Sequence, residues 1–180
     1  NRCYSLTHIK IPSSITYIGE KAFYSCFALN DIEIPSSVTM IGISAFAHCR
    51  SLTHIEIPPI QILRENVFYH CKALRKVTIP DTVTSIEYGC FQNCESLTEI
   101  FIPPSVECIG RAVFTCCEKL EKIEIPHGVK IIEPFTFENC HSLSQVIIPN
   151  TVTEIGNQAF DSCSSLKHID IPPSVKTIAH

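Results

Sequence analysis

The seven residues LTEIFIP (97–103) are one copy of a phrase that recurs along the whole chain of 180 residues. Each copy reads Leu-x-x-Ile-x-Ile-Pro, with Val in place of the first Ile twice, and successive copies start 23 residues apart except for one step of 22. A fixed period of about 20–29 residues on this pattern is typical of a solenoid in which each coil contributes one strand. The eight copies are LTHIKIP (6–12), LNDIEIP (29–35), LTHIEIP (52–58), LRKVTIP (74–80), LTEIFIP (97–103), LEKIEIP (120–126), LSQVIIP (143–149) and LKHIDIP (166–172).

Within each copy, the fourth and sixth residues are apolar and the residues beside them vary. In 97–103 these are Ile100 and Ile102, and a period of two is expected of a strand with one face on a core. The closing Pro103 has no N–H and cannot continue a ladder that is bonded on both sides. We therefore expect short strands that all end at one level.

Two further apolar units follow each phrase. The first is Val-x-x-Ile or a near equivalent, such as Val106 and Ile109, usually closed by glycine, and we interpret it as the turn onto the convex side. The second is an Ala-Phe unit with Cys three residues after the Phe, which predicts one stacked column of Phe and one of Cys. The seven pairs are Phe23/Cys26, Phe46/Cys49, Phe68/Cys71, Phe91/Cys94, Phe114/Cys117, Phe137/Cys140 and Phe160/Cys163.

The step of 22 residues has a local cause. The segment IPPIQILREN (57–66) has one residue fewer between strand and turn, and Arg64 stands where most neighbouring coils have glycine. We expect a slight kink or an altered turn at this coil.

The full pattern, L-x-x-I-x-I-P-x-x-V-x-x-I-G-x-x-A-F-x-x-C, resembles the BspA-type leucine-rich repeat, a family known from surface proteins of anaerobic bacteria and from protozoan parasites. The resemblance implies a right-handed, gently curved solenoid. One face would be a parallel β-sheet and the convex face would carry short strands, turns and irregular segments, with little helix. The departures are local, since Glu87 and Glu133 replace the turn glycine and Cys90 replaces the Ala before Phe91.

We expect residues 1–180 to form a single solenoid domain of about eight coils. The first coil has no Phe three residues before Cys3, and the chain stops after Ile178 before another Ala-Phe unit. Solenoids need capping repeats with a polar outer face. The sequence is therefore interpreted as an internal fragment that lacks both caps.

Composition and motifs exclude several classes of function. The net charge of −4 is spread along the chain, without a basic run that would follow a nucleic acid backbone. No apolar run approaches the roughly 20 residues that a membrane span needs. No nucleophile, phosphate-loop, metalloprotease or paired-carboxylate motif is found. We predict a non-enzymatic protein with no catalytic residue, cofactor or metal, no nucleic acid partner and no membrane insertion in this segment.

Eight of the eleven cysteines, one in each coil, form the expected column. Stacked parallel side chains would need local movement to form disulfides, and a straight file of thiols does not offer the tetrahedral set that zinc requires. Packing as small apolar side chains is favoured over disulfides and metal binding. Outside the column lie Cys90 in the Ala position, Cys108 at a position expected to be at least partly exposed, and Cys116. Cys108 and Cys116 are the candidates for any reactive thiol.

Three histidines, His48, His70 and His141, are neighbours in sequence of column cysteines. A Cys–His nucleophile pair or metal pair is one interpretation. Other coils have Asn or Ser directly before the Cys, as at Asn93 and Ser162, and these residues form turns. A turn role is therefore favoured for His48 and His70.

The second, third and fifth residues of each phrase should face away from the core, and the repeat does not fix them. Charged residues dominate these rows, but Phe101 and Ile147 are large and apolar. The predicted centre of a partner patch is Arg75, Lys76, Glu99, Phe101 and Ile147. The third-position row is His8, Asp31, His54, Lys76, Glu99, Lys122, Gln145 and His168, and the fifth-position row is Lys10, Glu33, Glu56, Thr78, Phe101, Glu124, Ile147 and Asp170.

In these rows Glu99 should lie between Lys76 and Lys122, and Asp31 between His8 and His54.

Two functions fit such a face. The first is a protein-interaction or adhesion module for a surface or matrix protein, at the cell surface as the resemblance implies. The alternative is an intracellular structural scaffold packed within a larger assembly, in the cytoplasm or cytoskeleton, which free thiols favour.

Overall fold

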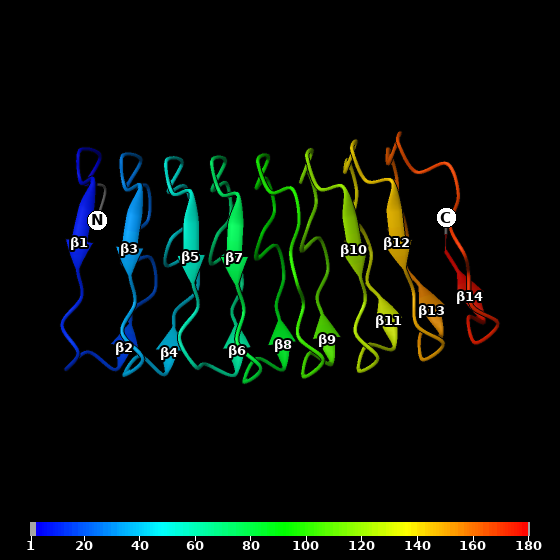
Figure 1. Cartoon of the computed structure of the whole chain (residues 1–180), viewed down its shortest axis with the longest axis horizontal. Coiled ribbons are helices and arrows are strands. Elements are labelled where there is room, and N and C mark those ends of the chain that lie inside the picture. Colours follow the sequence, from blue (N-terminus) through cyan, green and yellow to red (C-terminus); the bar gives the residue numbers. More distant parts are fainter. Residues whose placement is uncertain (1–2, 180) are drawn as a thin grey trace.

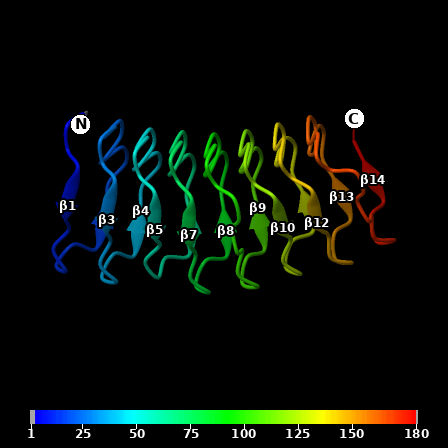
Figure 2. The same cartoon turned by 45° about the horizontal axis from the view of Figure 1, so that its top comes forward.

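A computed structural model describes residues 3–179, which form a parallel β-solenoid with no helix among them. The coils follow one another in chain order along the long axis of the molecule, as the two views in Figures 1 and 2 show. The fold predicted from the repeat is confirmed.

The repeated phrase builds three two-stranded parallel sheets along one side of the solenoid, which together are called the first sheet. β1 pairs with β3, β5 with β7 and β10 with β12, all in parallel and all with equivalent residues opposite one another. The central residue of β5, β7 and β10 is buried and its neighbours are exposed, as the alternation predicts. The strands are β1 (His8–Lys10), β3 (Asp31–Glu33), β5 (His54–Glu56), β7 (Lys76–Thr78), β10 (Lys122–Glu124) and β12 (Gln145–Ile147).

Two phrases differ from the expected strands. Residues 97–103 contribute one isolated bridge, Glu99 to Lys122, and no continuous strand, although Ile100 and Ile102 still point inward and are buried. Residues 166–172 form no strand either, and Ile169 is only half-buried there. The side-chain pattern that the sequence encodes is therefore kept where the backbone ladder is interrupted, because the inward residues are held by the core.

A second column of short parallel strands follows the phrase in each coil. The sequence indicated only a turn here. In the structure, the last two residues of the Val-x-x-Ile unit form a short strand that pairs with the equivalent strand of a neighbouring coil. The second residue of each strand points inward, except in β14. The strands are β2 (Tyr17–Ile18), β4 (Met40–Ile41), β6 (Ile62–Leu63), β8 (Ser85–Ile86), β9 (Cys108–Ile109), β11 (Ile131–Ile132), β13 (Glu154–Ile155) and β14 (Thr177–Ile178).

The third side of each coil is a series of overlapping turns around the Phe. In one coil, Gly89 and Asn93 have positive φ angles of 59° and 62°, and the N–H groups of Gly89, Phe91 and Asn93 donate to carbonyls of the next coil. The other coils repeat both positions. The positive-φ residues before the Phe are Lys21, Ser44, Asn66, Gly89, Ala112, Phe135 and Gln158, and those before the Cys are Ser25, His48, His70, Asn93, Cys116, Asn139 and Ser162. The turn role predicted for His48 and His70 is confirmed.

The Phe column is a continuous stack through the core. Adjacent rings lie 5.2 to 5.8 Å apart between centroids, with planes 4° to 8° from parallel. Phe46, Phe68, Phe91, Phe114 and Phe137 are fully buried. This column joins every coil to the next through a large apolar contact.

The cysteine column packs beside the Phe column. The six column thiols from Cys49 to Cys163 each donate to the carbonyl of the Phe one coil earlier, as Cys94 does to Phe68 at 3.4 Å and Cys117 to Phe91 at 3.2 Å. Six column thiols are buried, Cys163 is half-buried and Cys3 is exposed. Burial raises the pKa of the Cys49 thiol to about 12. The buried thiols therefore act as small packing groups with a weak hydrogen bond, and Cys90 is buried in the Ala column as expected.

The short coil is accommodated in one turn. The Ile60 N–H donates to the carbonyl of Pro58, two residues earlier, whereas in the next coil the Val83 N–H donates to Pro80, three residues earlier. Beyond this turn the ladder is in register again, with Ile62 opposite Ser85. The altered turn expected here is confirmed.

Replacing Phe91 by Ala should lower the free energy of unfolding by about 3–5 kcal/mol, because it leaves a cavity in the middle of the stack. The same change at Phe101, ten residues later and 70% exposed, should alter it by less than about 0.5 kcal/mol. Urea denaturation followed by circular dichroism measures both. Equal losses would show that the stack is not the stabilising element.

Native protein treated with iodoacetamide should be modified at Cys108, which is exposed, and protected at Cys94 and Cys117, whose thiols are buried with raised pKa values. The thiolate is the nucleophile, so burial and a raised pKa both protect Cys94 and Cys117. Mass spectrometry of peptides from native and urea-unfolded samples gives the order of reaction. Modification of Cys94 as fast as Cys108 would contradict the packing role.

Candidate functional site

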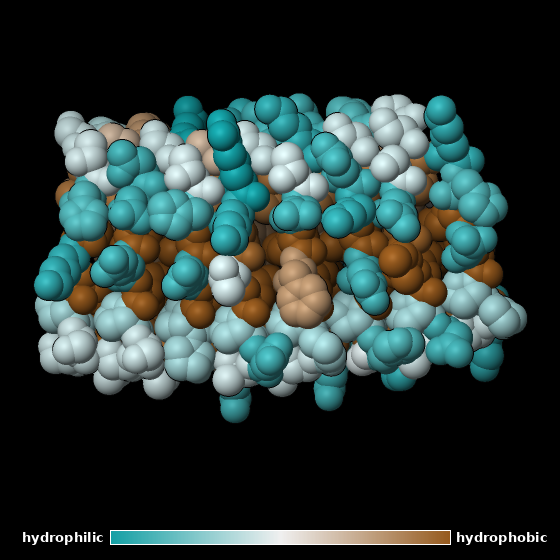
Figure 3. Space-filling model, in the orientation of Figure 1, coloured by the Kyte–Doolittle hydropathy of each residue, from teal (hydrophilic) through white to brown (hydrophobic). Residues whose placement is uncertain are grey.

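The face of the first sheet carries the two rows of outward side chains. The ladder registers place His54 beside Lys76 and Glu124 beside Ile147, so each row runs along the axis of the solenoid. Figure 3 shows this face, with a hydrophobic band between two rows of mostly hydrophilic side chains. The rows are thus the two walls of a shallow groove.

Ion pairs on this face connect adjacent coils. Glu99 Oε2 lies 3.7 Å from Lys122 Nζ, and Asp31 Oδ1 lies 3.2 Å from His54 Nε2, a contact that is an ion pair only when the imidazole is protonated. The sequence predicted partners on both sides of each acid, but within residues 3–179 the ion pairs of Glu99 and Asp31 go only to the following coil. These groups are exposed, so each pair contributes about 0–1 kcal/mol.

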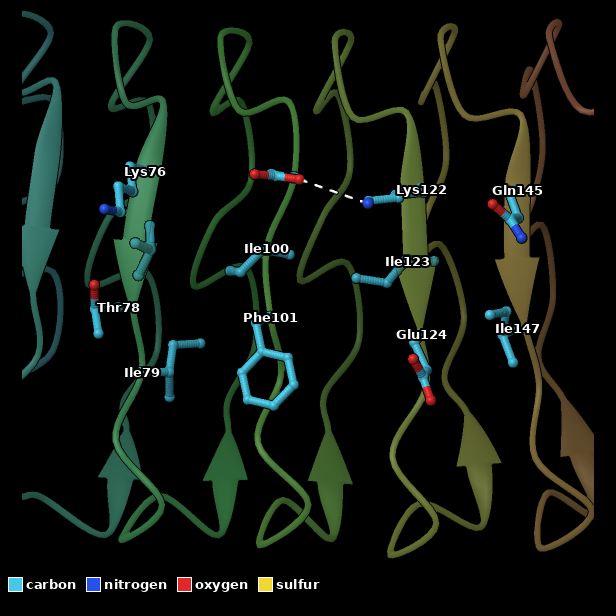
Figure 4. Close-up of a pocket in the computed structure, with 12 residues that line it drawn as sticks. Lys76, Thr78, Ile79, Ile100, Phe101, Lys122, Ile123, Glu124, Gln145 and Ile147 are labelled. Carbon is cyan, nitrogen blue, oxygen red and sulfur yellow. Dashed lines mark ion pairs between the residues drawn. The ribbon is translucent and has the colours of Figure 1, made fainter.

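A hollow of about 590 Å³ occupies the groove between β7 and β12. Four of the five residues predicted for a partner patch line it, namely Lys76, Glu99, Phe101 and Ile147. Figure 4 shows Phe101 in one row with Thr78, Glu124 and Ile147, and Lys76, Lys122 and Gln145 in the row opposite. Phe101 is 70% exposed and Ile147 is 47% exposed, so both present apolar surface to the solvent.

The fifth predicted residue, Arg75, is exposed but does not line the hollow. Its backbone N–H donates to the carbonyl of Thr53. The outward-facing lining residues that the sequence did not point to are Thr78, Lys122, Glu124 and Gln145. The fifth-position row already places Glu124 between Phe101 and Ile147, and that order is the signal that could have found it.

The groove differs at its other end. A hollow of about 440 Å³ lies among β1, β3 and β5, with Lys10, Asp31, Glu33, His54 and Glu56 in its lining. This part carries charged side chains where the hollow at Phe101 carries apolar ones. The apolar centre of the face is therefore confined to the coils from β7 to β12.

The side chains of His48 and His70 stack in adjacent coils, with ring centroids 4.9 Å apart and planes 12° from parallel. Edges of Tyr24 and Tyr69 pack against the stack. The Nδ1 atom of His70 is buried and has no hydrogen-bond partner within the described residues. This arrangement favours neutral rings.

The pKa values of both histidines are lowered, first by burial. The positive charge of Arg50 lowers the pKa of His48 further. The pKa of His70 is also lowered by the charges of His48, Lys72 and Arg50, while the negative charge of Glu95 raises it in part. A Cys–His nucleophile pair does not fit this geometry, because the Cys71 thiol donates to the carbonyl of Phe46 and burial raises its pKa. The stack is therefore a structural pair.

Two further findings concern metal sites and membrane spans in the described part of the chain. No group of three or more His, Cys, Asp or Glu side chains within residues 3–179 is arranged to hold a metal ion. In the same range, no helix is long and apolar enough to cross a membrane.

The solenoid and its face can be compared with known proteins. A family model described as the BspA type Leucine rich repeat region matches residues 1–63 and 61–180, with 6 copies. The T. pallidum Leucine Rich Repeat protein is 33% identical, with a TM-score of 0.84 over 89% of this chain and 78% of that one. A leucine rich cell surface protein from Faecalibacterium prausnitzii is 26% identical, with a TM-score of 0.56 over 99% and 71%. No curated protein matches the sequence.

The pneumococcal vaccine antigen PcpA has the same type of fold, at 21% identity and a TM-score of 0.56, over 96% of this chain and 58% of that one. At this identity the likeness concerns the fold alone.

Lowering the pH should reduce the stability of this protein through the histidine stack. Unfolded histidines bind protons near their ordinary pKa of about 6.5, while His48 and His70 in the folded state bind them only at lower pH. Their contribution to stability is therefore full above about pH 6.5 and decreases below it.

The double variant His48→Asn and His70→Asn should lose this part of the pH dependence. Asn is chosen because Asn93 occupies the equivalent position in another coil. Urea denaturation of both proteins between about pH 7.5 and 5 measures it. A variant with the slope of the wild type would exclude the stack as its origin.

Proposed function

This chain belongs to the BspA-type leucine-rich repeat family, and on that premise we propose that it is a non-enzymatic protein-interaction module that holds a protein partner on its first sheet. Leucine-rich repeat proteins generally mediate contacts between proteins. The exposed ring of Phe101, at the hollow between β7 and β12, is the observation that carries the proposal.

Phe101 and Ile147 expose apolar surface that a partner could cover. Nothing in the repeat requires an apolar residue at the fifth position, where Glu33, Glu56 and Glu124 stand in other coils. Covering such side chains with a partner gains about 25 cal/mol per Å² of apolar surface, and aromatic residues often dominate interfaces. Interfaces have a polar rim around their apolar centre. Around Phe101 and Ile147, this rim would consist of Lys76, Glu99 and Arg75.

We further propose that this module acts in adhesion at the cell surface. One structural neighbour is described as a leucine rich cell surface protein. The second candidate, an intracellular scaffold, draws support from the eleven free cysteines, which suit a reducing compartment. The two functions share the binding face and differ in the partner, which would be a surface or matrix protein in the first case and an assembly component in the second.

A photo-crosslinking amino acid at position 101 should capture the partner, and one at position 17, in β2 of the second column of strands, should not. The captured protein is then identified by mass spectrometry, purified and titrated against three forms of this chain. The double variant Phe101→Ser and Ile147→Ser should bind it at least about tenfold more weakly than the wild type.

The matched control is Tyr17→Ser with Met40→Ser. Both are exposed apolar residues, and they lie opposite each other in β2 and β4, away from the groove. This control should bind like the wild type. Equal affinity of all three forms would place the interface elsewhere on the molecule.

A further inference from the structure

The fifth-position row alternates in chemistry over its last four members. Phe101, Glu124, Ile147 and Asp170 follow one another, apolar then acidic, in successive coils. Glu124 lies beside Ile147 in the ladder, and Figure 4 shows Phe101, Glu124 and Ile147 in line. Because adjacent strands are about 4.8 Å apart, the two apolar side chains are separated by about 9.6 Å along the axis.

This spacing fits an extended chain. A polyproline II helix rises about 3.1 Å per residue and has three residues per turn, so residues i and i+3 lie on one side about 9.3 Å apart. Two apolar residues with that spacing would contact Phe101 and Ile147 together. The two residues between them point about 120° to either side of that contact, and a long basic side chain there would extend sideways to the carboxylate of Glu124.

The width of the groove favours the same occupant. Its walls are the third and fifth residues of one strand, such as Lys122 and Glu124, whose backbone positions are about 6.7 Å apart. An α-helix with its side chains is about 10–12 Å across. A helix would rest on the tips of these side chains, whereas a narrower extended chain comes closer to the floor of the groove.

The charge of Glu124 determines which kind of ligand residue would bind between the two apolar contacts. On this part of the face Lys122 is paired with Glu99, and within residues 3–179 no cation is paired with Glu124. The carboxylate of Glu124 is thus open to a basic side chain of the ligand, with apolar surface on either side of it. Such a contact would be flanked by apolar groups that exclude water, which strengthens it.

We propose that the groove binds an extended, polyproline-II-like segment of a protein partner, with apolar side chains three residues apart on Phe101 and Ile147 and a basic side chain between them on Glu124. This proposal rests on the proposed function and specifies the occupant of the same face. Proline in the segment would reduce the ordering entropy that binding costs.

The probe is a fluorescent peptide of the sequence Pro-Leu-Lys-Pro-Leu-Pro, titrated with the whole chain by fluorescence anisotropy. We expect a Kd of about 0.1–1 mM. Three comparison peptides test the features separately. One moves the second Leu a residue further away, one replaces Lys by Glu, and one is an Ala-rich helix carrying the same two Leu and one Lys. Each should bind at least about fivefold more weakly.

The decisive variant is Glu124→Lys, which should reverse the preference between the Lys and Glu peptides. Glu107→Lys is its matched control, since it makes the same charge change at an exposed residue that does not line the groove. That control should keep the preference of the wild type. Circular dichroism confirms that both variants are folded.

Several results would overturn the proposal. These are equal binding of all four peptides, stronger binding of the helical one, absence of binding to any, or an unchanged preference in Glu124→Lys. None of them bears on the crosslinking result at position 101, so the face could hold a partner of another shape. Conversely, a crosslinker at position 101 that captures no partner would contradict the proposed function itself.

Discussion

The backbone of each coil turns back on itself through two residues in the left-handed region, and the columns of the core depend on this turn. For most residues such a conformation costs roughly 1–2 kcal/mol. In the coil of Gly89 and Asn93, the turn aims three N–H groups at the next coil and sets Phe91 and Cys94 side by side facing the core. Hydrogen bonds between coils and burial of the two columns offset the cost. Phe135 adopts it too, with Arg111 stacked on its ring.

The repeat made most of this fold predictable. Its period gave the solenoid, the alternation gave the inward Ile100 and Ile102, and the Phe and Cys columns followed from their constant spacing. The hydrogen bond from the Cys94 thiol to the Phe68 carbonyl was not predictable, because it depends on how one coil is shifted against the next. The second column of strands was missed for a similar reason, since two residues are too few to show a period.

The candidate site was predictable only in part. Phe101 and Ile147 stood out because they break the composition of their row, and the structure brings them to one hollow. Arg75 was included for its side-chain type alone, and it lies outside that hollow. In the sequence, nothing distinguishes Glu124 from the other acidic residues of its row except the apolar residue on each side of it. Which of several similar charged residues lies at a site is set by geometry that the repeat does not encode.

The turns on the third side also orient the peptide groups. The N–H groups of Gly89, Phe91 and Asn93 all point toward the later coil, and the carbonyls of Arg111, Val113 and Thr115 that accept from them point back. Peptide dipoles aligned in this way add along the axis, as they do in an α-helix. On the third side these dipoles therefore have their positive pole toward higher residue numbers, whereas beside the second column of strands the N–H groups of Thr39 and Gly42 donate to the preceding coil. An anion near that end of the third side would be stabilised, and a cation near the other, without any charged side chain taking part.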